Sequence, residues 1–263
     1  MTVSGKMMRY LYVMIHARKK SGCKATVQSY YRTLHIRTIV QFVIIDFMKG
    51  VFTEHQGFWN ARNKRSLYFG ILLLVLALVI QSGAGRYSAR SALKSNFVGD
   101  IFLDNLPTLD LDFIIVEGAI LLWIFTGVLL VSRPQYLIFG LKAVALFIIT
   151  RSFFINLTHI GIYPQQAIFD STDIGYALYK LFTFQGNFFF SGHTGLPFLV
   201  ALVFWPERVW RHFFLLVSFI FGVSVLLAHV HYSIDVFAAP FLAYGIFRIA
   251  QKFFPKDYAL VSS

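Results

Sequence analysis

Long apolar runs dominate the order of hydrophobic and polar positions along this chain. Six runs approach the ~20 residues with which an α-helix crosses ~30 Å of hydrocarbon, and they cover about 66–82, 113–131, 136–157, 188–205, 212–229 and 235–251. The runs are continuous rather than alternating, which excludes the strands of a membrane barrel. The pattern predicts an all-α integral membrane protein with six transmembrane helices.

The composition agrees with this class of protein. Hydrophobic residues make up 57% of the 263 residues and charged residues only 14%, so a soluble domain of this composition would expose large apolar patches. We expect three parts along the chain: a basic amino-terminal segment at 1–65, a six-helix membrane domain at 66–252 and a short tail at 253–263.

The distribution of positive charge predicts the orientation of the chain. Twelve of the 24 Lys and Arg residues precede the first apolar run, and short cytoplasmic segments carry the excess of these residues. The amino terminus is therefore predicted to be cytoplasmic, and six spans return the carboxyl terminus to the same side. The segment 83–112, with its four aspartates, is predicted to lie on the outer or luminal side.

The net charge of +12 lies mainly in the amino-terminal segment 1–65, next to the membrane. Anionic lipid headgroups explain such a segment better than a nucleic acid does, so the membrane is the expected partner.

Met48 opens a plausible shorter chain. The single cysteine, Cys23, cannot form an internal disulfide, and the sequence does not distinguish the plasma membrane from an endomembrane. The oligomeric state is equally open.

An ionisable cluster lies at the ends of three of the predicted spans. Two antiparallel helices joined by a short turn would span the stretch of sequence between His193 and His231. Both histidines are therefore expected at the outer leaflet. Because an ionisable group within a membrane span is costly, such a cluster is usually functional.

The second histidine has a partner on its own helix. His231 and Asp235 are four residues apart, which places both side chains on one helix face. The carboxylate can accept the proton of one imidazole nitrogen and leave the other nitrogen basic, as a nucleophile or general base needs. A lone histidine at a membrane interface is more often a packing residue. The prediction of an active site therefore rests on His193, His231 and Asp235 taken together.

The first histidine lies in the sequence SGHTG at 191–195. Ser191, Gly192 and Thr194 surround His193 at the start of a predicted span, where free backbone N–H groups and the helix dipole favour an anion. This combination predicts a phosphate-binding site beside His193.

The sequences FFFSGHTG at 188–195 and HYSIDV at 231–236 resemble the paired histidine motifs of the sphingomyelin synthases, a branch of the type 2 phosphatidic acid phosphatase superfamily. TRSFFINLTHIGIYP at 150–164 resembles an Arg-containing segment of the same branch. The resemblance covers positions 110 to about 250 and does not reach the segment 1–65.

The resemblance implies a role for each histidine and for the aspartate. His231 would attack phosphorus, Asp235 would orient it, and His193 would protonate the departing diacylglycerol oxygen. The headgroup would pass from the phosphohistidine to an alcohol such as ceramide, or to water in a lipid phosphatase or phospholipase C-like enzyme. The resemblance implies neither a metal nor an organic cofactor, and it makes 66–252 the catalytic domain.

Two departures from the wider phosphatase pattern concern the phosphate clamp. Val225 stands where an arginine is expected six residues before His231, and Thr126 stands where a lysine is expected before Arg133-Pro134. Arg151 is the best replacement, since its guanidinium can hold two phosphate oxygens. The alternative role for Arg151 is an ion pair with Glu117.

A third departure concerns the headgroup. Gln185-Gly186-Asn187 replaces the Cys-Gly-Asp expected in the sphingomyelin-synthase branch. A choline or ethanolamine group needs an aromatic or anionic partner. The candidates in the outer loop are Tyr163, Tyr176, Tyr179, Asp170 and Asp173.

One alternative belongs to a different class of protein. His229 could join His231 and Asp235 in a metal site of a membrane protein without catalysis, although no further Cys, Asp or Glu is expected beside them. Asn156-Leu157-Thr158 matches the glycosylation pattern but is expected too close to the membrane for modification. Lys142 is expected to extend its ammonium group toward the membrane surface.

Overall fold

The computed structural model describes residues 45, 48–167 and 189–262. The chain divides into two compact units, 1–53 and 54–263. In the first unit the described residues, 45 and 48–53, are helical. Most of the predicted basic segment therefore lies outside the described residues.

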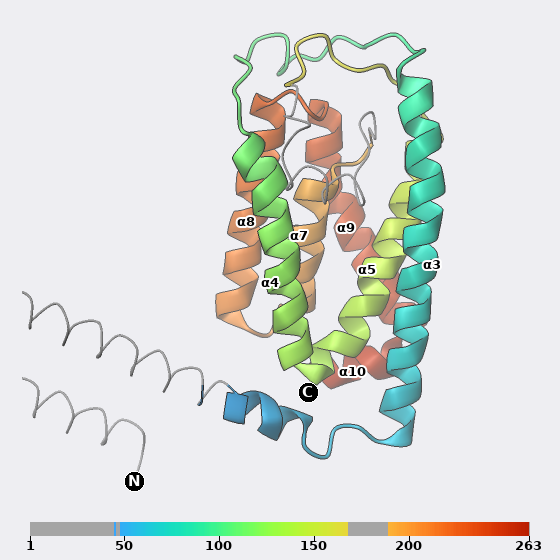
Figure 1. Cartoon of the computed structure of the whole chain (residues 1–263), viewed down its shortest axis with the longest axis vertical. Helices are drawn as coiled ribbons and strands as arrows, with labels where there is room; N and C mark the ends of the chain where they lie inside the picture. The colour runs from blue at the N-terminus through green and yellow to red at the C-terminus, as the bar shows by residue number, and fades with distance from the viewer. Residues whose placement is uncertain (1–44, 46–47, 168–188, 263) are drawn as a thin grey trace, which may run out of the picture. The chain divides into compact units, whose positions relative to one another are not determined.

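The second unit is a helical bundle (Figure 1). Its elements are α3 (Ala61–Ala92), the π-helical turn η1 (Phe113–Glu117) continuing into α4 (Gly118–Ser132), α5 (Pro134–Ile155), α7 (Gly192–Val203), α8 (Arg208–Leu227), α9 (Ser233–Phe253) and α10 (Pro255–Ser262). No strand occurs among the described residues. Five helices, with η1 and α4 counted as one, are long and apolar enough to cross a membrane. The predicted class, an all-α integral membrane protein, is confirmed.

Helix α7 is shorter than the predicted span at 188–205. Its 12 residues begin only at Gly192, because Ser191 is the N-cap and its hydroxyl accepts the Thr194 N–H at 3.4 Å. Its helical conformation ends at Val203, three residues before Pro206. The apolar run continues beyond both ends of the helix, so hydropathy overestimated its length.

Helix α3 is longer than the predicted span at 66–82. Asn60 caps its start by accepting the Asn63 N–H at 2.9 Å, and the helix continues to Ala92. Arg86 and Arg90 ended the apolar run in the sequence, but both are exposed, and the small residues Ala84 and Ser88 are buried on another face of the helix. An amphipathic stretch of helix thus follows the apolar part.

The tail contains a helix that hydropathy did not predict. Pro255 opens α10, a position that suits proline because the first helical N–H has no partner within the helix. Asp257 of this helix pairs with Lys142 of α5, and Lys142 is only 3% exposed. The prediction that Lys142 extends to the surface was therefore wrong, since a buried carboxylate meets its ammonium group.

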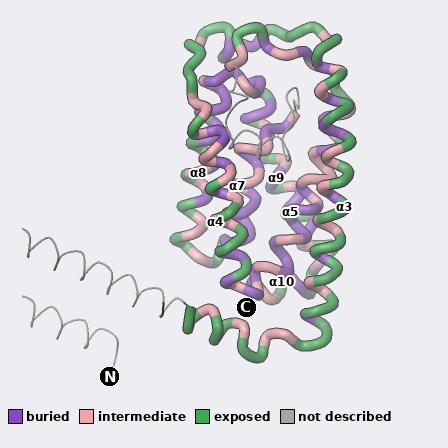
Figure 2. The backbone as a smooth tube through the Cα atoms, in the orientation of Figure 1, coloured by how far each residue is buried: buried purple, intermediate pink, exposed green. Residues whose placement is uncertain are grey.

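Helix α7 lies inside the bundle and packs against α5, α8 and α9. Figure 2 shows most of it as buried, whereas α3, which packs on α5, leaves one side exposed. We call the end of the bundle where α8 ends and α9 begins the histidine end. Its assignment to the outer or luminal side, with cytoplasmic termini, stays a prediction.

Candidate active site

His231 and Asp235 form the pair that the sequence predicted. His231 lies in the turn between α8 and α9, and Asp235 lies in the first turn of α9. The Asp235 Oδ2 is 3.2 Å from His231 Nδ1, and its carboxylate is completely buried. Because a carboxylate can only accept, Nδ1 is the ring nitrogen that donates to Asp235.

Asp235 is fixed by two backbone groups as well. The Tyr232 N–H donates to Oδ2 at 3.2 Å, which is half of a capping box, and the Phe189 N–H donates to Oδ1 at 3.0 Å. The carboxylate therefore connects the start of α9 with the residues just before α7.

His193 lies close to this pair, as predicted. The centroids of the His193 and His231 rings are 6.2 Å apart. The Ser191 N–H donates to the Asp235 carbonyl at 3.0 Å, which couples the N-cap of α7 to the first turn of α9. The two histidine motifs, although far apart in the sequence, thus lie together in the structure.

The flanking residues of the SGHTG motif shape the start of α7. The Thr194 hydroxyl donates to Ser191 Oγ at 3.3 Å, and the Thr194 carbonyl accepts from Ser218 of α8 at 2.7 Å. Ser191 and Thr194 are buried. Their hydroxyls are thus engaged with each other in the described structure, and they orient the helix that carries His193.

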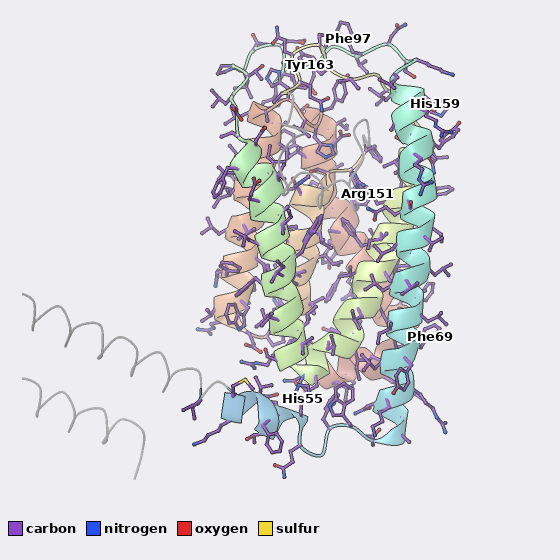
Figure 3. All side chains as sticks on the ribbon, viewed as in Figure 1. His55, Phe69, Phe97, Arg151, His159 and Tyr163 are labelled. Carbon is purple, nitrogen blue, oxygen red and sulfur yellow. The ribbon has the colours of Figure 1, made fainter. Side chains whose placement is uncertain are left out.

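Arg151, near the end of α5, lies beside the same helix start. Its Nε donates to the Phe190 carbonyl at 2.8 Å, and a Cβ placed on Gly192 would lie 3.5 Å from that Nε. Figure 3 shows Arg151 in the upper part of the bundle, below Tyr163 and Phe97. Among the described contacts it forms no ion pair with Glu117.

Arg133 and Val225 mark the two departures from the phosphatase pattern. Neither lies where it could help to clamp a phosphate group. Arg133, in the turn between α4 and α5 at the other end of the bundle, pairs with Glu207 at 3.0 Å. Val225 is completely buried, and its carbonyl accepts the Val230 N–H at 2.9 Å. Arg151 is thus the arginine that the fold brings to the histidines.

Two tyrosines make hydrogen bonds near the turn that carries His231: Tyr232, which was not predicted as part of the site, and Tyr163, which was a candidate for headgroup binding. Tyr232 donates from its hydroxyl to the Gly161 carbonyl at 2.9 Å, and Tyr163 donates to Asp104 at 2.7 Å. The hydrogen bond to Asp104, with burial, raises the pKa of Tyr163 to about 12. Of the headgroup candidates, Tyr163 is thus engaged with Asp104, and Tyr176, Tyr179, Asp170 and Asp173 lie outside the described residues.

Asp100 contacts the start of α9, and His229 lies in the turn before it. Burial alone would raise the pKa of Asp100, but backbone N–H groups of Ser233, Leu103 and Phe102 outweigh it and lower the pKa. Burial lowers the pKa of His229, which is completely shielded from solvent. In the sequence, Asp100 stood out only as one of four aspartates in 83–112, and these were used to predict the orientation of the chain, not the site.

The described residues contain no group of three His, Cys, Asp or Glu side chains arranged to hold a metal ion. His229 Nδ1 lies 3.2 Å from the Thr108 hydroxyl, and His231 Nδ1 lies against Asp235. The metal-binding alternative therefore has no ligand set among these residues.

Comparison with known proteins adds one finding. Residues 186–252 match the family model described as PAP2 superfamily C-terminal, and the match includes His193, His231 and Asp235. No curated protein matches the chain. The match covers about a quarter of the chain, and it supports the type 2 phosphatidic acid phosphatase superfamily, whose members are phosphatases and phosphotransferases.

Proposed function

We propose that this chain is a membrane lipid phosphotransferase of the sphingomyelin-synthase type. It moves a phospho-headgroup from a glycerophospholipid to an alcohol such as ceramide. The family match supports a phosphatase or phosphotransferase acting on lipids. The observation that supports a two-step reaction through a phosphohistidine is the pairing of the two histidines. Their ring centroids are 6.2 Å apart, and Asp235 lies against Nδ1 of His231.

In the first half of the reaction His231 Nε2 attacks the phosphorus of the phosphodiester. The bond from phosphorus to the diacylglycerol oxygen breaks, and protonated His193 gives its proton to that oxygen. Asp235 stabilises the positive charge that His231 acquires. Diacylglycerol leaves, and the headgroup stays on His231 as a phosphohistidine.

In the second half the acceptor hydroxyl takes the place of diacylglycerol. Neutral His193 removes its proton as the oxygen attacks phosphorus, the bond to His231 breaks, and His193 is protonated again. The cycle is balanced and needs one acid–base group and one nucleophile.

Arg151 and the start of α7 supply the phosphate contacts. The N-terminus of this 12-residue helix carries partial positive charge, and its first backbone N–H groups point out of the helix. Arg151 lies beside Gly192 at the same place. A guanidinium can follow the spreading negative charge of the transition state because it donates in a plane to two oxygens.

Water can replace the alcohol in the second half, which would make the chain a lipid phosphatase or a phospholipase C-like enzyme. The same residues serve both reactions, so the acceptor depends on what reaches the phosphohistidine. The assay must therefore measure both products.

The test uses the full chain, purified in lipid, with labelled ceramide and a mixture of phosphatidylcholine and phosphatidylethanolamine. His231→Ala should abolish turnover. His212→Ala removes an exposed histidine from α8 and is the matched control, which should keep normal rates. A phosphosphingolipid made by the wild type and the control alone supports transfer and identifies the headgroup.

Other outcomes decide against the proposal in different ways. Diacylglycerol with free phospho-headgroup and no ceramide product would identify a hydrolase. Absence of any lipid turnover, together with stoichiometric metal that His231→Ala loses, would favour the non-catalytic metal-binding alternative.

A further inference from the structure

We propose that Asp100, in the segment between α3 and η1, is a positioning residue for His231. The inference rests on the proposed function, because it concerns the same nucleophile. It assigns a role in the chemistry to a segment that is distant from His231 in the sequence and lies outside the matched region 186–252.

The Asp100 carboxylate binds three backbone N–H groups. Its Oδ2 accepts from Ser233 at 2.7 Å, and its Oδ1 accepts from Phe102 at 2.9 Å and from Leu103 at 3.2 Å. The residue is only 7% exposed. Because both oxygens are engaged with the backbone, Asp100 acts through Ser233 and not by touching the substrate.

The start of α9 needs such a partner. The first N–H groups of a helix have no acceptor within the helix, and a side chain at the N-cap usually supplies one. Tyr232 occupies the N-cap of α9, and its hydroxyl points to Gly161 instead. Asp100 therefore caps this helix from a distant part of the chain, and its charge matches the positive end of the helix dipole.

Two carboxylates thus hold residues 231–233, which include the nucleophile His231. Asp235 accepts from the Tyr232 N–H and lies against the His231 ring, while Asp100 accepts from the next N–H, that of Ser233. Successive backbone N–H groups are fixed by aspartates from two different segments. The backbone that follows His231 has little freedom to rotate.

Other contacts from the same segment hold the rest of the turn. The Leu109 N–H donates to the Leu227 carbonyl at 2.8 Å, the Val98 N–H donates to the Tyr232 hydroxyl at 3.3 Å, and Thr108 meets His229 at 3.2 Å. His229 has a φ of 53°, in the left-handed region that non-glycine residues rarely adopt. Such a conformation persists only where its surroundings determine it.

The segment 98–109 therefore acts as a template for the turn 227–233. Without Asp100 the first turn of α9 loses its external acceptor, and the His231 ring can move relative to Asp235 and His193. A displacement of about 1 Å at a reacting group can cost roughly a hundredfold in rate. Substrate binding through Arg151 and α7 would be unaffected.

The experiment compares Asp100→Asn with Asp110→Asn in the purified full chain. Asp110 is an exposed aspartate of the same segment, so its variant is the matched control. We expect Asp100→Asn to lower kcat roughly ten- to a hundredfold with KM within about twofold, while the control keeps both constants. A purely structural role would lower the amount of folded enzyme without changing the rate of phosphohistidine formation per folded molecule.

A second pair of variants removes the same hydrogen bond from the other side. Ser233→Pro deletes the donated N–H at the first position of α9, where proline is well tolerated, and the preceding Tyr232 has a ψ of 154° that suits a following proline. Ser233→Ala keeps the N–H and loses only the hydroxyl, which also hydrogen-bonds to Asp100, so it is the matched control for the N–H. Ser233→Pro should reproduce the loss in kcat, and Ser233→Ala should lower kcat less.

The outcomes separate this inference from the proposed function. If the wild type turns over no phospholipid, the proposed function fails and the inference fails with it. If the wild type is active and both Asp100→Asn and Ser233→Pro match their controls in kcat, the positioning role alone is overturned.

Discussion

Lys142 Nζ on α5 lies 2.5 Å from Asp257 Oδ2 on α10, and the two side chains are only 3% and 10% exposed. Ser66 of α3 joins them: it accepts from Lys142 at 2.6 Å and donates to Asp257 at 2.8 Å. Three helices thus meet at one buried ion pair. The rings of Phe69 and Phe254 lie 5.3 and 5.1 Å from the same ammonium group.

Asp257→Asn should therefore destabilise the bundle strongly. It leaves the buried ammonium group without its counter-charge, which typically costs about 3–5 kcal/mol. Thermal unfolding in detergent measures the effect. Glu54→Gln, which removes the 3.9 Å pair between two partly exposed side chains, should cost at most ~1 kcal/mol. Equal shifts in the two variants would contradict the assigned importance of the buried pair.

Asp235→Asn should leave the chain folded and lower kcat by roughly 10²–10⁴. An amide can donate to His231 Nδ1 and so stabilise the tautomer whose Nε2 is protonated and cannot attack. The matched comparison is the double variant Asp235→Asn/His231→Ala. It should be as inactive as His231→Ala alone, because residues that act as a unit are not additive. Near-normal turnover in Asp235→Asn would remove this residue from the mechanism.

Arg151→Lys should lower kcat/KM by roughly ten- to a hundredfold, because a point charge cannot replace a planar donor that contacts two oxygens. The variant also loses the Nε donor to the Phe190 carbonyl. Steady-state kinetics with thermal unfolding in parallel separates the two effects. Arg133→Lys, at the other end of the bundle, is the control. A change confined to the unfolding temperature would mean that Arg151 is structural.

Gly195→Ala should destabilise the chain by about 1–3 kcal/mol. A Cβ at this position would lie 2.9 Å from Phe147 Cζ. Phe147 is 2% exposed and packs edge-on against Phe190 at 5.3 Å, so it has little room to move. Gly127→Ala, where no atom lies within 4 Å, should be neutral or raise stability by up to ~1 kcal/mol. Comparable stability of the two variants would refute the close approach of α7 to α5.

Tyr163→Phe should change the response to alkaline pH. The pKa of Tyr163 is raised to about 12 from its ordinary 10.0, so its stabilising effect is complete below pH 10 and is lost as the pH rises through about 12. The difference in unfolding temperature between wild type and Tyr163→Phe should be constant below pH 10 and shrink between pH 10 and 12. A constant difference over this whole range would contradict the hydrogen bond to Asp104.

The sequence predicted those parts of the fold that depend on hydropathy or on local spacing. The runs that became α4, α5, α8 and α9 were found within a few residues, and His231 with Asp235 was found from its four-residue spacing. Asp100 could not be found in this way, because its partner is a backbone N–H at position 233 and no periodicity links the two. Lys142 was misjudged for a similar reason: its partner Asp257 lies in a segment without an apolar run.

Helix α7 has 12 residues, so it rises only about 18 Å, well short of the ~30 Å thickness of the hydrocarbon layer. Figure 1 shows its first turn below the ends of α8 and α9. Under the proposed function, a phospholipid must bring its headgroup to His193 at a greater depth than the headgroups of the surrounding lipids, while its acyl chains remain in the bilayer. We expect membrane thickness to affect the rate: thinner bilayers should favour turnover, which a series of phosphatidylcholine vesicles with increasing acyl length would reveal.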